Sequence, residues 1–268
     1  MTQIRVLSLG AGVQSTTLAL LAAHNEIAAP DVAIFADTQW EPRAVYDHLA
    51  WLMSEGVLPF PINIVSVGDI RDGIRNRRSA RDGHFAAVPW HLVKPDGSLG
   101  MGRRQCSAEY KLDPIAEEVR RLLGKPYPAR IAPGSVEMMI GISLDEIQRV
   151  KPSKRKFMRN TYPLIDLAMR RWDCLRWLER HGYPTPPKSA CIGCPYTPNS
   201  RWRDRRDNHP QEWEEAVRMD RELREGARGH HGVEFMHRSC MPLDDVDLEV
   251  DDRQLDMFTN ECDGVCGV

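Results

Sequence analysis

The chain opens with strands and helices in alternation, and this order restricts the fold more than any other feature. The run IRVLSL (4–9) predicts a buried strand, which is followed by a glycine-containing turn and a helix over 15–24. VAIFA (32–36) and INIVS (62–66) predict two more strands, with a helix over 41–54 between them. Such alternation is typical of a parallel sheet with helices on both faces and right-handed crossovers. We therefore expect an α/β fold.

The rest of the chain carries fewer signals. Residues 71–105 are rich in Arg, Gly, Asp and Pro without periodicity, which predicts a long loop, and 151–160 reads as a basic loop. Further elements are expected as a helix over 112–124, a strand over 136–143, a helix over 170–181 with Trp172, Leu175 and Leu178 on one face, and a charged helix over 210–227. We expect an α/β domain over 1–182 and a C-terminal helical, cysteine-bearing extension and tail over 183–268.

Composition excludes some partners and indicates a compartment. The 268 residues carry a net charge of −2, so bulk charge calls for neither a nucleic acid nor a membrane. No run of eighteen apolar residues predicts a membrane span, and the N-terminus has no signal-peptide pattern. The seven cysteines are odd in number, which argues against a disulfide framework and favours a reducing, cytoplasmic setting.

The turn after the first strand reads Gly10-Ala11-Gly12-Val13-Gln14-Ser15. Small residues before a helix N-terminus let backbone N–H groups approach a phosphate, and the helix dipole favours negative charge there. The hydroxyls of Ser8, Ser15 and Thr16 can add hydrogen bonds. No Gly-Lys-Ser/Thr follows, so the turn is not a Walker loop. The alternative is a tight turn without a ligand.

Polar residues also follow other predicted strands, where open α/β sheets bind ligands. Asp37 and Thr38 follow the second strand. Asp37 can accept a hydrogen bond from a nucleoside, or it can cap the following helix. A basic cluster after the 136–143 strand suits a sulfate or phosphate group, or it is a solvated face. Its members are Arg149, Lys151, Lys154, Arg155 and Lys156.

Three cysteines have a spacing that suits metal chemistry. Cys191 and Cys194 form a C-x-x-C segment with Gly193 in the turn and Pro195 after it, as in several iron–sulfur segments. Cys106 lies earlier, in RRQCSAEYKLDPI. A zinc ribbon commonly needs two such pairs, and only one is present. The alternative is three unrelated thiols, and Cys174 reads as a buried core residue.

Together these segments resemble the phosphoadenosine phosphosulfate (PAPS) reductase family of the adenine nucleotide α-hydrolase (PP-loop) superfamily. The matching stretches include LSLGAGVQSTTLALL, FADTQWEPRAVYDHL, GISLDEIQR and PLIDLAMRRW. The resemblance implies an adenine nucleotide held by Ser8, Gly10, Ala11, Gly12, Gln14, Ser15, Asp37, Thr38, Gly141, Ser143 and Arg149. Gln14 stands where the ATP-hydrolysing form has an Asp that suits magnesium, so it favours a sulfonucleotide (APS or PAPS) over ATP. Gln39 and Ser143 replace the family's usual Gly and Arg.

The resemblance also implies a 4Fe–4S cluster on Cys106, Cys191 and Cys194. Gln105 replaces one family cysteine, so the fourth ligand is Cys240, Cys262 or Cys266, or one iron is open. The terminal ECDGVCGV resembles the reductase tail, whose Glu-Cys-Gly segment carries the nucleophile, although the usual histidine is absent. Cys262 and Cys266 are therefore the expected catalytic residues.

Three functions follow as hypotheses. The first is a thiol-dependent reduction or sulfur transfer on a sulfonucleotide, with a thioredoxin-like protein as reductant. The second is an ATP-dependent iron–sulfur thiolation enzyme that modifies a nucleic acid, either tRNA or DNA. The third is a non-catalytic nucleotide sensor with a redox-labile cluster.

Overall fold

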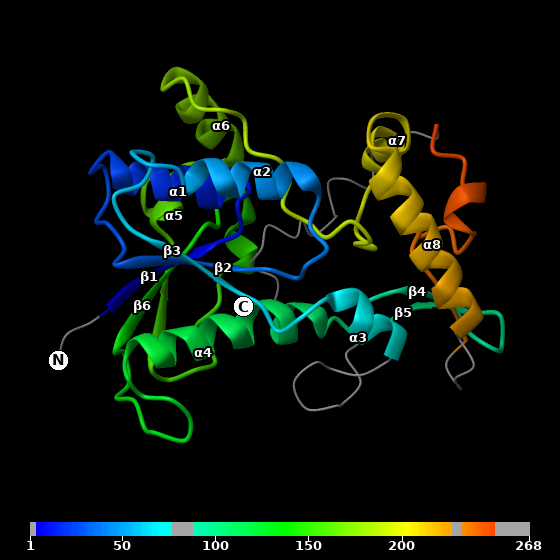
Figure 1. The fold of residues 1–268 in the computed structure, drawn as a ribbon, viewed down its shortest axis with the longest axis horizontal. Helices are drawn as coiled ribbons and strands as arrows, with labels where there is room; N and C mark the ends of the chain where they lie inside the picture. The colour runs from blue at the N-terminus through cyan, green and yellow to red at the C-terminus, as the bar shows by residue number, and fades with distance from the viewer. Residues whose placement is uncertain (1–3, 77–87, 227–231, 250–268) are drawn as a thin grey trace. The chain divides into compact units, whose positions relative to one another are not determined.

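The computed structural model describes residues 4–76, 88–226 and 232–249 (Figure 1). The contacts divide these residues into two compact units. Unit 1 comprises residues 4–67 and 110–190, and unit 2 comprises the described residues of 68–109 and 191–249. Each unit therefore takes its chain from two separate stretches of sequence.

Unit 1 is built on a five-stranded sheet in the order β3-β2-β1-β6-β7. Its strands are β1 (Ile4–Leu9), β2 (Val32–Ala36), β3 (Ile62–Val65), β6 (Val136–Ile140) and β7 (Met158–Thr161). Every neighbouring pair is parallel; for example, Leu7 is in register with Ala33 on one side and Met139 on the other. The expected α/β sheet is thus confirmed, and its carboxyl ends meet at one edge.

Alternate residues of the strands pack toward opposite faces, as the twofold repeat of a strand requires. Leu7, Phe35 and Met139 lie in a core with α1, α2 and α6. Val6, Ile34 and Met138 lie in a second core with α4. These helices are α1 (Val13–Ala23), α2 (Arg43–Leu52), α4 (Asp113–Leu122) and α6 (Arg171–Arg180), with the short α5 (Pro163–Asp166) and η2 (Leu144–Arg149) between β6 and α6. Helices therefore cover both faces of the sheet.

Unit 2 combines helices with a small antiparallel sheet in the order β5-β4-β8. Its elements are α3 (Ile70–Asn76), β4 (His91–Val93), β5 (Leu99–Met101), α7 (Asn199–Asn208), α8 (Pro210–Gly226), β8 (Val233–Phe235) and η3 (Leu243–Asp245); the π-helical turn η1 (Ala108–Leu112) leads into α4. Asp220 of α8 is fully buried and accepts the backbone N–H groups of Met236 (2.8 Å) and Leu243 (2.9 Å). This one carboxylate therefore fastens the segment after β8 to the helix.

Three sequence predictions need correction. The expected loop over 71–105 contains most of α3 and both β4 and β5, whose strands are too short to show a period. The basic loop over 151–160 ends in β7, an edge strand with the polar sequence MRNT. The 170–181 helix is present, but Trp172 is 61% exposed, and Cys174, Trp177 and Leu178 are its buried residues.

No helix within the described ranges has the length and apolar character that a bilayer crossing requires.

Candidate functional site

The glycine turn joins β1 to α1 in unit 1 and is closed by a serine. Ser15 Oγ accepts hydrogen bonds from the backbone N–H groups of Gly10 (3.2 Å) and Gly12 (3.3 Å). Ala11 takes the left-handed conformation with φ 56°, which is uncommon for a residue other than glycine. The turn is thereby held at the N-terminus of α1, where backbone amides and the helix dipole favour an anion.

The end of β6 lies directly against this turn. A Cβ atom built on Gly141 would lie 2.8 Å from the backbone N and 2.9 Å from the Cα of Ser15. Only glycine fits this approach without movement of backbone. The structure therefore brings Gly141 together with Gln14 and Ser15, as the sequence assignment of a shared site requires.

Gln14 is 1% exposed, and both ends of its amide are used. Its Oε1 accepts from Arg171 Nη1 (2.7 Å), and its Nε2 donates to Glu146 Oε2 (3.2 Å) and Ser143 Oγ (3.4 Å). Glu146 in turn pairs with Arg149. The neutral amide of Gln14 therefore links the guanidinium of Arg171 to the carboxylate of Glu146. The sequence analysis quoted Glu146 and Arg171 within GISLDEIQR and PLIDLAMRRW but did not pair them with Gln14, because Gln14 is far away in the chain.

Asp37 follows β2 and is held by local hydrogen bonds. Its Oδ1 accepts from the backbone N–H of Gln39 (2.8 Å) and from Tyr46 Oη (2.9 Å). Burial and the nearby Asp37 carboxylate raise the pKa of Tyr46 above its ordinary value. Pro42 is the N-cap of α2, so the idea that Asp37 caps this helix is wrong. Asp37 is instead fixed at the strand end.

Thr38 leads to a buried ion pair. Glu41 Oε1 accepts from Thr38 Oγ1 (3.1 Å) and from Lys111 Nζ (3.2 Å), and the two charged side chains are only 1% and 8% exposed. Charges are buried in this way only when they are paired and hydrogen-bonded. Lys111 therefore ties the KLDPI segment to the loop after β2, a role that its sequence context did not reveal.

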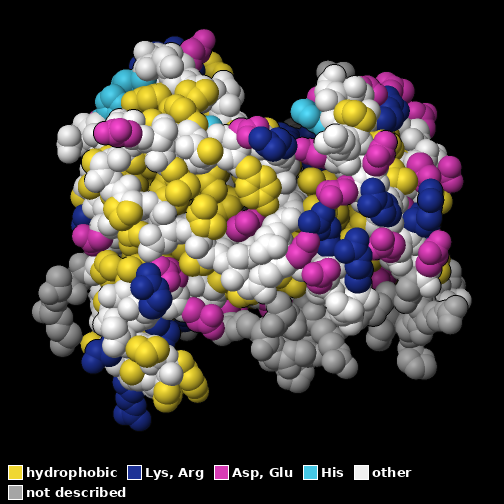
Figure 2. All heavy atoms as spheres, viewed as in Figure 1, with side chains coloured by type: hydrophobic (Ala, Val, Ile, Leu, Met, Phe, Trp, Pro, Cys, Tyr) yellow, Lys and Arg dark blue, Asp and Glu magenta, His cyan; other side chains and the backbone are white. Residues whose placement is uncertain are grey.

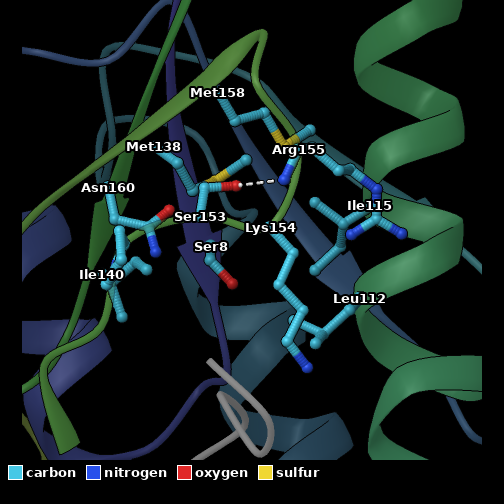
Figure 3. A pocket seen from close by; sticks show the side chains of 11 residues that line it. Ser8, Leu112, Ile115, Met138, Ile140, Ser153, Lys154, Arg155, Met158 and Asn160 are labelled. Atoms are coloured by element: carbon cyan, nitrogen blue, oxygen red, sulfur yellow. Dashed lines mark hydrogen bonds between the residues drawn. The ribbon is translucent and has the colours of Figure 1, made fainter.

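A small cavity opens beside β1, β6 and β7 (Figure 3). Its volume is about 70 Å³. Its lining is mostly apolar with a polar margin, and comprises Ser8, Leu112, Ile115, Met138, Ile140, Pro152, Ser153, Lys154, Arg155, Met158 and Asn160. Arg155 also pairs with Asp113. An apolar hollow with hydroxyl, amide and ammonium groups at its margin suits one flat ring with an anionic substituent.

The cysteines predicted as metal ligands all belong to unit 2. The N–H of Cys194 donates to the carbonyl of Cys191 (3.1 Å), which closes the C-x-x-C turn. Burial raises the pKa of Tyr196, to which the neighbouring thiol groups of Cys194 and Cys106 also contribute, while Arg104, 5.0 Å from the Tyr196 ring, opposes them. Tyr196 therefore lies within electrostatic reach of both Cys106 and Cys194.

Two basic side chains lie near this turn, and one of them, Arg205, is paired with Glu212 (3.4 Å). His91 Nε2 donates to the carbonyl of Pro195 (3.2 Å), and burial lowers the pKa of His91. Arg205 lies within electrostatic reach of Cys194, and burial lowers the pKa of its guanidinium. A basic side chain near a thiol favours the thiolate that metals and electrophiles require.

The remaining cysteines differ in their surroundings. Cys174 is a fully buried residue of α6, and burial raises its pKa to about 12, so its interpretation as a core residue is confirmed. Cys240 is partly buried, which raises its pKa. Cys262 and Cys266 lie outside the described residues.

Comparisons with known proteins give matches to solved structures. No family profile matches the chain, and no curated protein matches its sequence. Among solved structures, the chain is similar to phosphoadenylyl-sulfate (PAPS) reductase from Candida auris in its phosphate complex. The two are 12% identical, the TM-score is 0.42, and the match covers 68% of this chain and 74% of that one.

Proposed function

We propose that unit 1 binds an adenine nucleotide at the carboxyl edge of its sheet. The observation that carries this proposal is that the glycine turn and Asp37 follow strand ends of one parallel sheet, whose strands β1, β6 and β7 also line the cavity beside Ser8. The turn would hold phosphate with backbone amides, and the apolar cavity would take the base. Ser8, Gly10, Ala11, Gly12, Gln14, Ser15, Asp37, Thr38, Gly141, Ser143 and Arg149 remain the proposed binding residues.

Within this proposal, the nucleotide is a sulfonucleotide of the APS or PAPS type. Gln14 brings no negative charge to the turn, and its amide is held between Arg171 and Glu146. The carboxylate beside Gln14 is that of Glu146, which is paired with Arg149, whereas a magnesium ion on ATP phosphates favours carboxylate oxygen that can coordinate it. Lys154 at the cavity margin supplies a positive charge that suits a sulfate or phosphate directly.

The proposed reaction is a thiol-dependent reduction. A cysteine thiolate, assigned to Cys262 or Cys266, attacks the sulfate sulfur and forms an S–S bond, while the S–O bond to the nucleotide breaks and its electron pair leaves with the nucleoside phosphate. A thiolate of a thioredoxin-like dithiol then attacks the cysteine sulfur and releases sulfite. Its second thiol resolves the mixed disulfide, so the dithiol is oxidised and the sulfate sulfur is reduced.

A 4Fe–4S cluster belongs to the same proposal. Cys106, Cys191 and Cys194 would be its ligands, because thiolates are the ligands that iron–sulfur clusters require and Tyr196 lies within electrostatic reach of two of them. When bound, the cluster would act electrostatically and as structural support rather than in electron transfer. The fourth ligand would be Cys240, Cys262 or Cys266, or one iron would have no protein ligand.

The test is nucleotide binding and turnover by anaerobically purified protein. Titration calorimetry with APS, PAPS and ATP should give the tightest binding for a sulfonucleotide, and sulfite should appear when a thioredoxin-like dithiol is added. Lys154→Ala should weaken that binding about tenfold, as expected for loss of one charged contact. Lys156→Ala is the matched control, because this exposed neighbour does not line the cavity.

The other results decide between the alternatives. Conversion of ATP to AMP without sulfite would favour the iron–sulfur thiolation enzyme acting on tRNA or DNA. Tight nucleotide binding without turnover would favour a sensor. Absence of binding by any adenine nucleotide would overturn the proposal.

A further inference from the structure

Three metal-ligating side chains meet at the opposite end of α1 from the glycine turn. His24 caps the C-terminus of α1, Glu26 follows it, and His181 caps the C-terminus of α6. Each offers a ligand atom within 4.8 Å of the other two, and all three side chains are exposed. The eleven residues of α1 span about 16 Å, so this cluster is separate from the proposed nucleotide site.

Each of the three side chains is held by a hydrogen bond through one of its two possible ligand atoms. His181 Nδ1 donates to the carbonyl of Trp177 (2.8 Å), which leaves its Nε2 as the free lone pair. His24 Nε2 bonds Tyr183 Oη (2.8 Å), which leaves its Nδ1. Glu26 Oε1 accepts from Trp177 Nε1 (3.1 Å), which leaves its Oε2. Metal-binding histidines and carboxylates are commonly held by such outer hydrogen bonds.

Aromatic packing makes the cluster rigid. The His181 ring stacks on Trp177 with centroids 4.0 Å apart, and the ring of His24 meets Trp177 edge-on at 5.3 Å. Tyr183 packs on the same group. Figure 2 shows histidine side chains gathered beside hydrophobic ones near the end of α6. Ligands that are already fixed lose little entropy when an ion binds.

A hollow of about 330 Å³ adjoins the cluster and shares Glu26 and Trp177 with it. Arg176 and Arg180 also line this hollow. Three protein ligands leave one position of a tetrahedral ion for water or another oxygen. The two arginines would favour an anionic oxygen nearby.

We propose that His24, Glu26 and His181 form a binding site for Zn²⁺ with one open coordination position. Two imidazoles and one carboxylate are ligands that Zn²⁺ takes in proteins. Within the described part of the chain, these side chains bring three ligand atoms of His, Cys, Asp or Glu within 4.8 Å of one another. The ion would join the loop after α1 to the end of α6. This role does not depend on nucleotide binding.

The test is titration of the full chain with ZnCl₂ by calorimetry. His24→Ala should bind one equivalent fewer than the wild type, whatever zinc the cysteines take up, because thiolate sites are present in both proteins. His209→Ala is the matched control, since this exposed histidine at the end of α7 is outside the cluster, and it should bind as the wild type does. Equal stoichiometry in His24→Ala and the wild type would overturn the proposal.

Tyr183→Phe provides a second measurement that keeps the ligands intact. It removes only the hydrogen bond to His24 Nε2, and loss of an outer partner weakens metal binding about 10–100-fold. The stoichiometry should stay at the wild-type value while the affinity of the histidine site falls. Unchanged affinity in Tyr183→Phe would contradict the assigned geometry.

Discussion

Gly141 and Ser15 approach so closely that a single methyl group would separate them. A Cβ atom on Gly141 would lie 2.8 Å from the backbone N of Ser15 and 3.1 Å from the carbonyl carbon of Gln14. These atoms belong to the first turn of α1, which cannot move independently of the sheet. The end of β6 therefore fixes the position of the glycine turn.

Gly141→Ala should disturb both stability and nucleotide binding. Forcing a methyl group against backbone costs about 1–3 kcal/mol of unfolding free energy, and the turn must shift to relieve it. Urea denaturation and nucleotide titration would measure the two effects. Gly124→Ala is the control, because Gly124 has φ 62° with nothing within 4 Å, so it should lose stability through backbone strain and keep nucleotide affinity.

Gln14→Glu should destabilise unit 1 at neutral pH. The new carboxylate keeps an acceptor for Arg171 but places an oxygen where Nε2 now donates to Glu146. Loss of a hydrogen bond to a charged group, with two buried acceptors face to face, costs about 1–3 kcal/mol. Adding Glu146→Gln should restore most of the loss in urea denaturation. A double variant no more stable than Gln14→Glu alone would contradict this explanation.

The sequence predicted those parts of the fold that depend on local pattern. β1, β2 and β3 are short apolar runs, and the glycine turn lies between one of them and a helix, so their order alone indicated the sheet. β7 was not predicted, because MRNT is polar and follows basic residues. Its place in the sheet depends on pairing with β6. Edge strands and three-residue strands carry too little period to be distinguished from loops.

The sequence predicted the site residues that follow strand ends. It did not predict the side chains that bond to the site residues from distant parts of the chain. Gly141 and Asp37 follow strands and could be assigned from position. Arg171 reaches Gln14 across 157 positions, and Lys111 reaches Glu41 across 70. Such pairs depend on how helices pack on the sheet, and a single sequence shows no pattern for them. The proximity of His24 and His181 was not predicted for the same reason.

Lys111→Met should destabilise the protein strongly. The substitution leaves the Glu41 carboxylate buried without its cation, and breaking a buried pair in this way costs about 3–5 kcal/mol. Glu41→Gln in the same chain removes the remaining charge and should recover part of the loss. Asp47→Ala is the matched control: it breaks the exposed pair with Arg43, whose side chains are 60% and 83% exposed, and should change stability by less than about 1 kcal/mol.

His48 should make stability fall as the pH falls below 6.5. Burial lowers the pKa of this imidazole from 6.5 to about 4, and its Nε2 lies 3.0 Å from Thr16 Oγ1 at the start of α1. Because the folded pKa is depressed, the unfolded chain takes up a proton first. The contribution of neutral His48 to the free energy of unfolding is therefore complete above the unfolded pKa and is lost as the pH falls toward the folded pKa.

A shift of this size in the pKa of His48 corresponds to about 2 kcal/mol of unfolding free energy between pH 7.5 and pH 5. In urea denaturation across this range, His48→Gln should lose stability less steeply than the wild type. Parallel curves for His48→Gln and the wild type would show that this histidine is not the group that titrates.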